Sequence, residues 1–130
     1  MDRLHTPPGW PPQVRPPGAP AWERTAVAWL LDVCPPEYRG YAVLRNHGVV
    51  LARFALLHVD AAHAAVRRGL SEARGVLRDV ADPDTVEAAG LTWQAEEARL
   101  TAERRAVGLV EEALRGRRCV ARLCTRAATL

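Results

Sequence analysis

The sequence predicts an all-α fold, built around one long antiparallel helical hairpin. Residues 49–80 contain no proline, and apolar residues recur there at alternating spacings of three and four, as on one face of a packed helix. Residues 86–114 carry a second stripe with the same spacing. Only Ala81-Asp82-Pro83-Asp84 separates the two stripes, and helices joined by so short a turn must run antiparallel.

The segment before the hairpin divides into an arm and two short helices. Half of residues 7–20 are proline, so residues 1–20 are predicted to form a Pro-rich extended arm. Pro17-x-x-Pro20 matches the minimal ligand of an aromatic groove, but we favour an arm that lies over the protein's own helices, held by Trp10. Two helices are then expected, over 21–34 and 36–46, with Pro35-Pro36 between them and Asn46-His47-Gly48 at the end.

The hairpin itself is predicted as helices over 49–80 and 83–115. Asp82 suits the N-cap of the second helix, and Gly116 suits its C-terminal stop. The helical domain therefore covers 21–116, and a basic C-terminal tail covers 117–130. Laying the stripes against each other sets His63 opposite Glu103, a polar pair in the seam that would fix the register of the coiled-coil-like contact.

Carboxylates near His63 raise an alternative interpretation of the same seam. Asp60-x-x-His63 resembles half of the Glu plus Glu-x-x-His set that holds two metal ions in ferritin-like bundles. The chain has one such motif instead of two, so we expect a hydrogen-bonded pair and no cofactor. A metal-binding protein is the alternative, with the candidate ligands Asp60, His63, Glu96 and Glu103.

A stripe of small residues lies on nearly the opposite face of the second long helix. Small side chains let helices approach closely, so this face is a candidate interaction face for a second copy, giving a homodimer, or for a protein partner. Alanine also favours helices without any partner, and the sequence leaves both interpretations open. The face comprises Ala95, Ala98, Ala102, Ala106 and Leu109.

Composition argues against several classes of function. The chain has no GxSxG motif and no glycine-rich phosphate loop, so we expect no enzyme and no small-molecule substrate. All 18 basic residues are arginine, a bias typical of GC-rich genomes. A nucleic-acid accessory role is a further alternative, and we do not favour it because the preceding helix is acidic. Its candidate contacts are Arg117, Arg118, Arg122 and Arg126.

Cellular location follows from the apolar segments and the cysteines. We expect no signal peptide, and no membrane helix, because Arg53 interrupts the most apolar run. Three cysteines do not suit a disulfide framework, and Cys119 and Cys124 lack the spacing of a zinc site. A cytoplasmic protein without a membrane partner is the expectation.

Residues 22–32, WERTAVAWLLD, continue into Pro35-Pro36-Glu37-Tyr38-Arg39. This stretch resembles small uncharacterised helical proteins of high-GC actinobacteria such as streptomycetes. The resemblance implies a helical fold and supplies no activity. Our sequence-based hypothesis is therefore a non-enzymatic helical-bundle module for protein interaction, with self-association or a protein partner.

Overall fold

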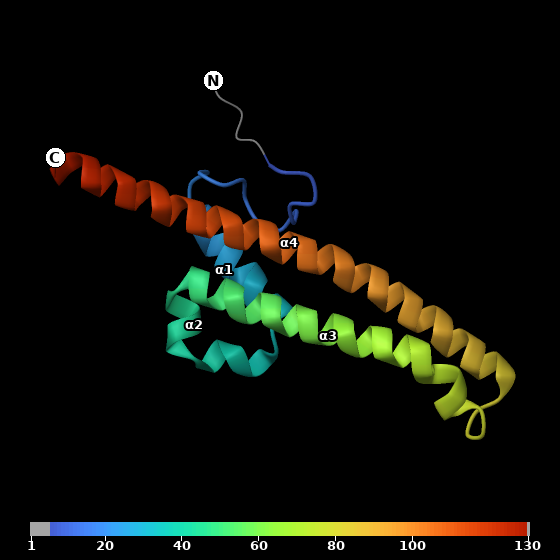
Figure 1. The fold of residues 1–130 in the computed structure, drawn as a ribbon. Coiled ribbons are helices and arrows are strands. Elements are labelled where there is room, and N and C mark those ends of the chain that lie inside the picture. Colours follow the sequence, from blue (N-terminus) through green and yellow to red (C-terminus); the bar gives the residue numbers. More distant parts are fainter. Residues whose placement is uncertain (1–5, 130) are drawn as a thin grey trace. The chain divides into compact units, whose positions relative to one another are not determined.

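A computed structural model describes residues 6–129, with side-chain surroundings described for residues 6–116. Within this part the chain is all-helical, and the long helices α3 and α4 pack against each other, which confirms the predicted fold class (Figure 1). The elements are α1 (Trp22–Val33), the 3₁₀ helix η1 (Pro36–Gly40), α2 (Ala42–Asn46), α3 (Gly48–Leu77) and α4 (Pro83–Thr129).

The chain divides into two compact units. Unit 1 combines residues 1–56 with residues 105–130, and unit 2 is the hairpin of residues 57–104. Each unit contains part of α3 and part of α4. Only unit 1 contains α1, η1, α2 and the proline-rich arm.

In unit 1, α1 buries one face made by Trp22, Ala26 and Leu30. The helix begins after Ala21, whose φ of 60° is left-handed, and it has no side-chain cap. It ends at Val33, and Cys34 has extended backbone (φ −86°, ψ 163°) because Pro35 disfavours helical backbone in the residue before it. The single helix predicted over 36–46 is wrong: Tyr41 has extended backbone (φ −95°, ψ 113°) and separates η1 from α2.

The proline-rich arm lies over the helices of unit 1, as the favoured interpretation predicted. The predicted extended conformation is wrong: the described part of the arm folds into successive turns, in which the amides of Trp10, Val14 and Ala19 donate to the carbonyls of Pro7, Pro11 and Pro16. The indole Nε1 of Trp10 donates to the carbonyl of Val14 at 2.9 Å, and the Trp10 and Trp22 rings lie 6.3 Å apart. Gly9 lies so close to α4 that an added Cβ would be 3.0 Å from Arg105 Nε and 3.5 Å from Leu109 Cδ1. Val14 is 3% exposed, so the arm contributes to the core of this unit.

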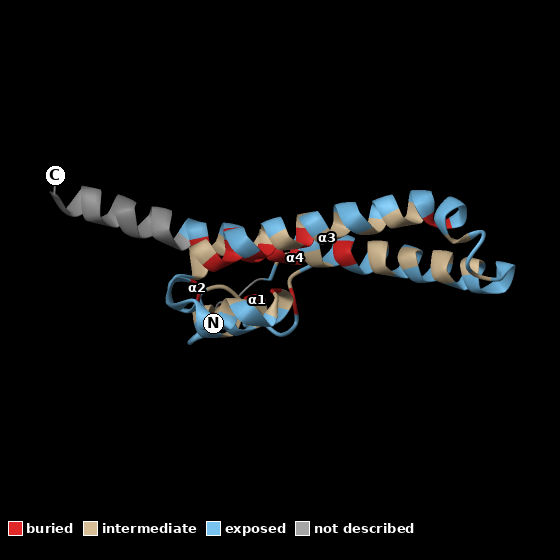
Figure 2. Ribbon diagram, turned by 90° about the horizontal axis from the view of Figure 1, so that it is seen from below, coloured by how far each residue is buried: buried red, intermediate tan, exposed pale blue. Residues whose placement is uncertain are grey.

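Beyond the arm, the core of unit 1 is formed by α1, α3, α4 and Leu44 of α2. A Cβ on Gly48, at the start of α3, would be 3.4 Å from Val27 of α1 and 3.6 Å from Leu114 of α4, so three helices meet there. Figure 2 shows the buried residues gathered along these helices. The buried hydrophobic residues of α3 and α4 in this unit are Leu51, Ala52, Ala55, Ala106, Val107, Val110 and Leu114.

Unit 2 is a bare helical hairpin with a short turn. Asp82 caps α4, since the Thr85 amide donates to Asp82 Oδ1 at 2.7 Å. The expected end of α3 at residue 80 is wrong: α3 stops at Leu77, whose carbonyl accepts from the amides of Val80 and Ala81. Only Val59, Ala73 and Leu100 are buried hydrophobic residues of this unit.

The predicted helix end at residue 115 is also wrong, because α4 continues through Gly116 to Thr129. A glycine within a helix costs only about 1 kcal/mol relative to alanine, and no proline follows Gly116 to stop the helix. The segment predicted as a separate basic tail is therefore continuous with the helix in its backbone.

Candidate functional site

The polar seam of unit 2 differs from the predicted pair of His63 and Glu103. His63 Nε2 lies 3.1 Å from Thr101 Oγ1, while Glu103 Oε2 accepts from Arg99 at 3.3 Å. Thr101 donates its own hydroxyl proton to the Glu97 carbonyl, so the shared proton of the first contact is assigned to His63 Nε2. The predicted pair is wrong by about two residues of register, consistent with the earlier end of α3.

The carboxylates of the candidate metal set each have an arginine partner. Asp60 Oδ1 lies 2.5 Å from Arg104 Nε, and Glu96 accepts from Arg99 at 2.8 Å. The hydrogen bond from Arg99 lowers the pKa of the Glu96 carboxyl. Hydrogen bonding to Glu96 in turn raises the pKa of Arg99.

The structure does not bring Asp60, His63, Glu96 and Glu103 together as one group. Among the residues whose side chains are described, no group of three or more His, Cys, Asp or Glu lies close enough to hold a metal ion. Asp60, Glu96 and Glu103 pair with arginine and His63 contacts Thr101, so the candidate ligands of the ferritin-like alternative do not converge in the described chain.

The predicted alanine-rich face is divided between the two units. In unit 2, Ala95, Ala98 and Ala102 are exposed. In unit 1, Ala106 is buried and Leu109 is half-buried, with Gly9 of the arm against Leu109. The face is thus covered by the chain itself where the arm reaches it, and it is open along the hairpin.

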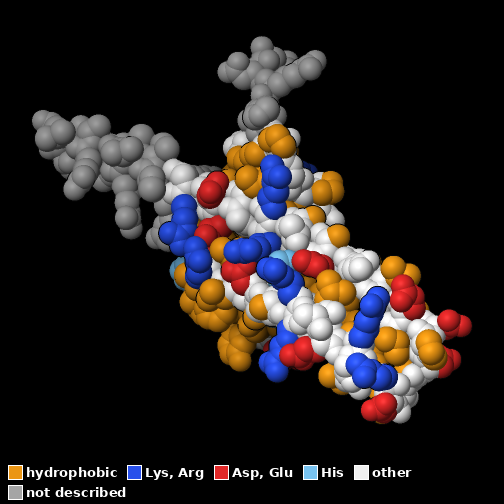
Figure 3. All heavy atoms as spheres, turned by 45° about the vertical axis from the view of Figure 1, so that its right-hand side comes forward, with side chains coloured by type: hydrophobic (Ala, Val, Ile, Leu, Met, Phe, Trp, Pro, Cys, Tyr) orange, Lys and Arg blue, Asp and Glu red, His pale blue; other side chains and the backbone are white. Residues whose placement is uncertain are grey.

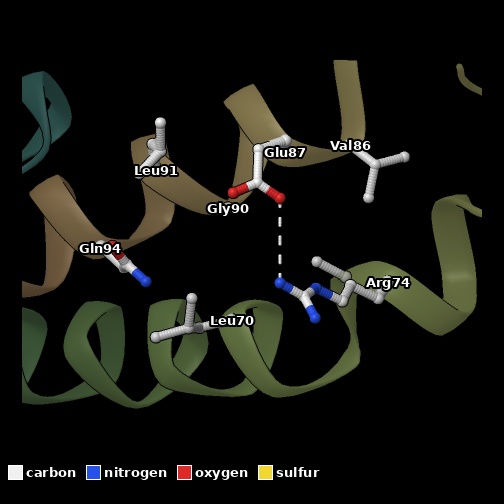
Figure 4. A pocket seen from close by; sticks show the side chains of 8 residues that line it. Leu70, Arg74, Val86, Glu87, Gly90, Leu91 and Gln94 are labelled. Atoms are coloured by element: carbon white, nitrogen blue, oxygen red, sulfur yellow. Dashed lines mark ion pairs between the residues drawn. The ribbon is translucent and has the colours of Figure 1, made fainter. Parts of the chain in front are cut away.

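A groove between α3 and α4 lies beside this face in unit 2 (Figure 4). It has a volume of about 300 Å³, and it exists because Gly90 and Ala73 offer little side chain to fill it. Arg74 and Glu87 stand across the groove with 3.9 Å between Nη2 and Oε2. Its apolar lining comes from Leu70, Val86 and Leu91, so it can accept an apolar side chain.

Sequence reasoning missed an exposed aromatic cluster in unit 1. Tyr41 is 56% exposed and Phe54 is 45% exposed. The ring of Tyr38 lies between them, 6.4 Å from the Tyr41 ring and 5.8 Å from the Phe54 ring. Phe54 lies outside the predicted seam stripe, and that absence from the stripe is the signal that could have placed it on the outer face of α3.

The candidate nucleic-acid contacts Arg117, Arg118, Arg122 and Arg126 lie outside the residues whose side chains are described.

Among the described residues, one helix is long and apolar enough to cross a membrane, by length and composition alone. This is α3, with a mean hydropathy of 1.5 over its most apolar 18 residues. Core helices of soluble proteins share these properties, so the observation alone is weak. Of that window, however, only 22% is buried, which leaves much of its apolar surface uncovered.

Comparison with protein-family models, with curated proteins and with solved structures finds no match to this chain.

Proposed function

We propose that the chain is a non-enzymatic helical interaction module that binds a second copy of itself through unit 2. The observation that carries this proposal is the small core of the hairpin. Residues 57–104 bury only Val59, Ala73 and Leu100 among their hydrophobic side chains. A hairpin of this size rarely reaches stability from its own core alone, and association is one of the usual remedies.

The open part of the alanine-rich face supplies the contact surface. Ala95, Ala98 and Ala102 follow one another at helical spacing, and Leu91, 59% exposed, precedes them one turn earlier. Side chains this small allow two helices to approach to the lower end of the usual 8–10 Å interaxial distance. Pairing α4 with α4 of the second copy would cover this stripe on both chains.

The charge of this face favours a second copy over a strongly charged partner. The stripe is flanked by the neutral, exposed side chains of Thr92, Gln94 and Thr101. Arg99, next to Ala98, already forms ion pairs with Glu96 and Glu103 of its own helix. Two copies of a neutral face meet without like-charge repulsion, whereas a charged partner would find no counter-charge here.

The test is the oligomeric state of the full chain over a range of concentrations, measured by light scattering and sedimentation. We expect a dimer whose dissociation constant rises about tenfold or more in Ala98→Glu and in Ala102→Glu, because each buries a carboxylate in the contact. Ala61→Glu is the matched control, since Ala61 is an exposed alanine of α3 in the same unit. A monomer at every concentration, or a dimer that neither change weakens, contradicts the proposal.

A further inference from the structure

The proline-rich arm of unit 1 is a feature that self-association through unit 2 does not explain. The arm lies against α4, where a Cβ on Gly9 would be 3.0 Å from Arg105 Nε and 3.5 Å from Leu109 Cδ1. Leu109 is the residue of the alanine-rich face that the arm reaches, and it is half-buried. The arm therefore occupies a surface of α4 that a partner helix would otherwise contact.

The covered surface continues the face assigned above to self-association. Leu109 follows Ala102 by seven residues, which is two turns of one continuous helix, so the two side chains lie on the same face of α4. That face is exposed at Ala98 and Ala102 and is covered by the arm at Leu109. The arm thus sets how far along α4 the open face extends.

Side-chain contacts hold the arm on unit 1. Val14 is buried, the Trp10 ring lies 6.3 Å from the Trp22 ring, and the Arg15 amide donates to Thr25 Oγ1 at 3.0 Å. The backbone hydrogen bonds of the turns described above stay within the arm, so they can persist when the arm leaves the helices. Detachment therefore breaks contacts with α1 and α4 and leaves the turns of the arm intact.

Two features of the seated arm oppose these contacts. Ala21, which joins the arm to α1, has a φ of 60°, and this left-handed backbone is less favourable for alanine than for glycine. The indole N–H of Trp22 is buried without a hydrogen-bond partner among the described residues, which also costs free energy. When the arm leaves, Ala21 is free to adopt a negative φ, and Trp10 no longer covers the Trp22 ring.

We propose that the arm is an autoinhibitory strap: when it leaves α4, Leu109 joins the contact with a second copy of the chain. This inference rests on the proposed self-association and adds its regulation.

The charges around Leu109 fit a second copy. Arg105 and Glu112, one turn away on either side, are both exposed and have opposite signs, so the uncovered surface is neutral like the face in unit 2. On the described surface that Figure 3 presents, acidic and basic side chains are interspersed among hydrophobic ones. Charge therefore selects no partner of one sign here.

The test opens and closes the arm in the full chain. Gly9→Ala opens it, because Gly9 has a φ of 92° and an added Cβ would crowd Arg105. Gly40→Ala is the matched control, since a Cβ on this glycine of the same unit meets nothing within 4 Å. Ala21→Gly acts in the opposite direction, because glycine adopts left-handed backbone readily and so favours the seated arm.

Two measurements follow the arm and the association separately. Hydrogen exchange of the Arg15 amide, which is bonded to Thr25 in the seated arm, should rise about threefold or more in Gly9→Ala and fall in Ala21→Gly. The dissociation constant of the dimer, measured by sedimentation, should fall about threefold or more in Gly9→Ala and rise in Ala21→Gly, because more or fewer chains are competent for the extended contact. Gly40→Ala should change neither.

Leu109→Gln separates the proposed contact from a general exposure of apolar surface. Added to Gly9→Ala, it should cancel the gain in affinity, because the side chain that joins the contact is lost. A chain without residues 1–20 is the second variant, and it uncovers Leu109 even if Gly9→Ala leaves the arm seated. Circular dichroism confirms that each variant is folded.

The proposal is overturned if the arm opens without a tighter dimer, or if the gain in affinity survives Leu109→Gln. It is also overturned if Gly9→Ala changes neither measurement and the folded chain without residues 1–20 associates no more tightly than the wild type. These results leave the contact of unit 2 untouched, because Ala98→Glu tests that contact and no variant used here alters unit 2. A monomer in the wild type and in every variant overturns both proposals.

Discussion

The two units of this protein are built from the same two helices, yet they differ in how those helices are covered. In unit 1, α1 and the proline-rich arm add a layer to α3 and α4, and Leu30, Leu51 and Val110 become fully buried. In unit 2 the two helices have only each other, and even Leu70 in the seam is half-buried. Two helices that pack only against each other bury a narrow strip of side chains. A third layer encloses the side chains between the helices and makes a hydrophobic core.

The ion pairs differ in the same way. In unit 2, Arg67 with Glu97 and Arg74 with Glu87 span the two helices at 3.9 Å, and all four side chains keep contact with solvent. Exposed pairs of this kind contribute little to stability. In unit 1 the side chain of Glu111 is only 8% exposed, and its partner Arg53 holds it. Unit 1 is therefore destabilised if the buried Glu111 carboxylate loses its partner, and unit 2 has no buried charged residue of this kind among its described side chains.

The largest predicted effect comes from the core of unit 1. Leu30→Ala should lower the free energy of unfolding by about 2–5 kcal/mol, because a fully buried leucine leaves both lost burial and a cavity. Leu70→Ala, in the half-buried seam of unit 2, should cost about 1 kcal/mol. Urea unfolding followed by circular dichroism measures both, and similar losses would show that the two units are equally well packed.

The ion pair of Arg53 and Glu111 gives the second-largest predicted effect, and the loss of stability differs between the two partners. Arg53→Met should cost about 2 kcal/mol, because it leaves the Glu111 charge buried, with Arg115 at 3.8 Å as its remaining ion-pair partner among the described side chains. Glu111→Met should cost less, because Arg53 is half exposed and solvent can hydrate its free guanidinium. Urea midpoints of the two variants give the comparison. A larger loss in Glu111→Met would mean that the pair itself stabilises the fold.

Two glycines of α3 sharpen the description of unit 2. A Cβ on Gly69 would lie 2.8 Å from Cε2 of the Trp93 indole and closer still to its Nε1, whereas a Cβ on Gly75 would meet nothing within 4 Å. Gly69→Ala should therefore cost about 1–3 kcal/mol by displacing Trp93. Gly75→Ala should stabilise the helix by about 0.5–1 kcal/mol. Thermal unfolding tests both, and stabilisation by Gly69→Ala would mean that the seam is loose enough for the indole to move.

The sequence predicts correctly those parts of the fold in which apolar residues recur with helical periodicity. Alternating spacings identified α3 and α4, and the turn chemistry of Asp82 and Pro83 placed the start of α4 correctly. Helix ends without such signals were misplaced. Gly116 suits a C-terminal stop, but a single glycine does not end a helix when helix formers follow it.

The candidate site was less predictable, because contacts between helices depend on exact register. His63 contacts Thr101 instead of Glu103, and α3 ends three residues earlier than predicted, so the register of the two helices differs from the predicted one. The alanine-rich face was found by its spacing, but the sequence could not show that the arm covers it only near Leu109. The exposed aromatic cluster of Tyr38, Tyr41 and Phe54 depends on η1 and α3 meeting in space, and no local sequence pattern predicts that contact.

The smallest predicted effect is a dependence on pH that belongs to unit 2. Hydrogen bonds from the Thr85 side chain and amide hold the pKa of Asp82 below its usual value, and Arg99 does the same for the pKa of Glu96. A carboxyl whose pKa is lower in the folded state stabilises the fold above its unfolded pKa, near pH 4, and this contribution is lost as the pH falls through the folded value.

Unit 2 should therefore lose stability below about pH 4. Hydrogen exchange of the amides in residues 83–100 at pH 6 and pH 3, corrected for the intrinsic rates, should show protection falling more at the lower pH in the wild type than in Asp82→Ala, which has no cap left to protonate. Asp84→Ala is the matched control, because Asp84 lies in the same first turn of α4 without being its cap. If Asp82→Ala and Asp84→Ala respond to acid alike, the negative charge at the start of α4 matters and the cap hydrogen bond does not.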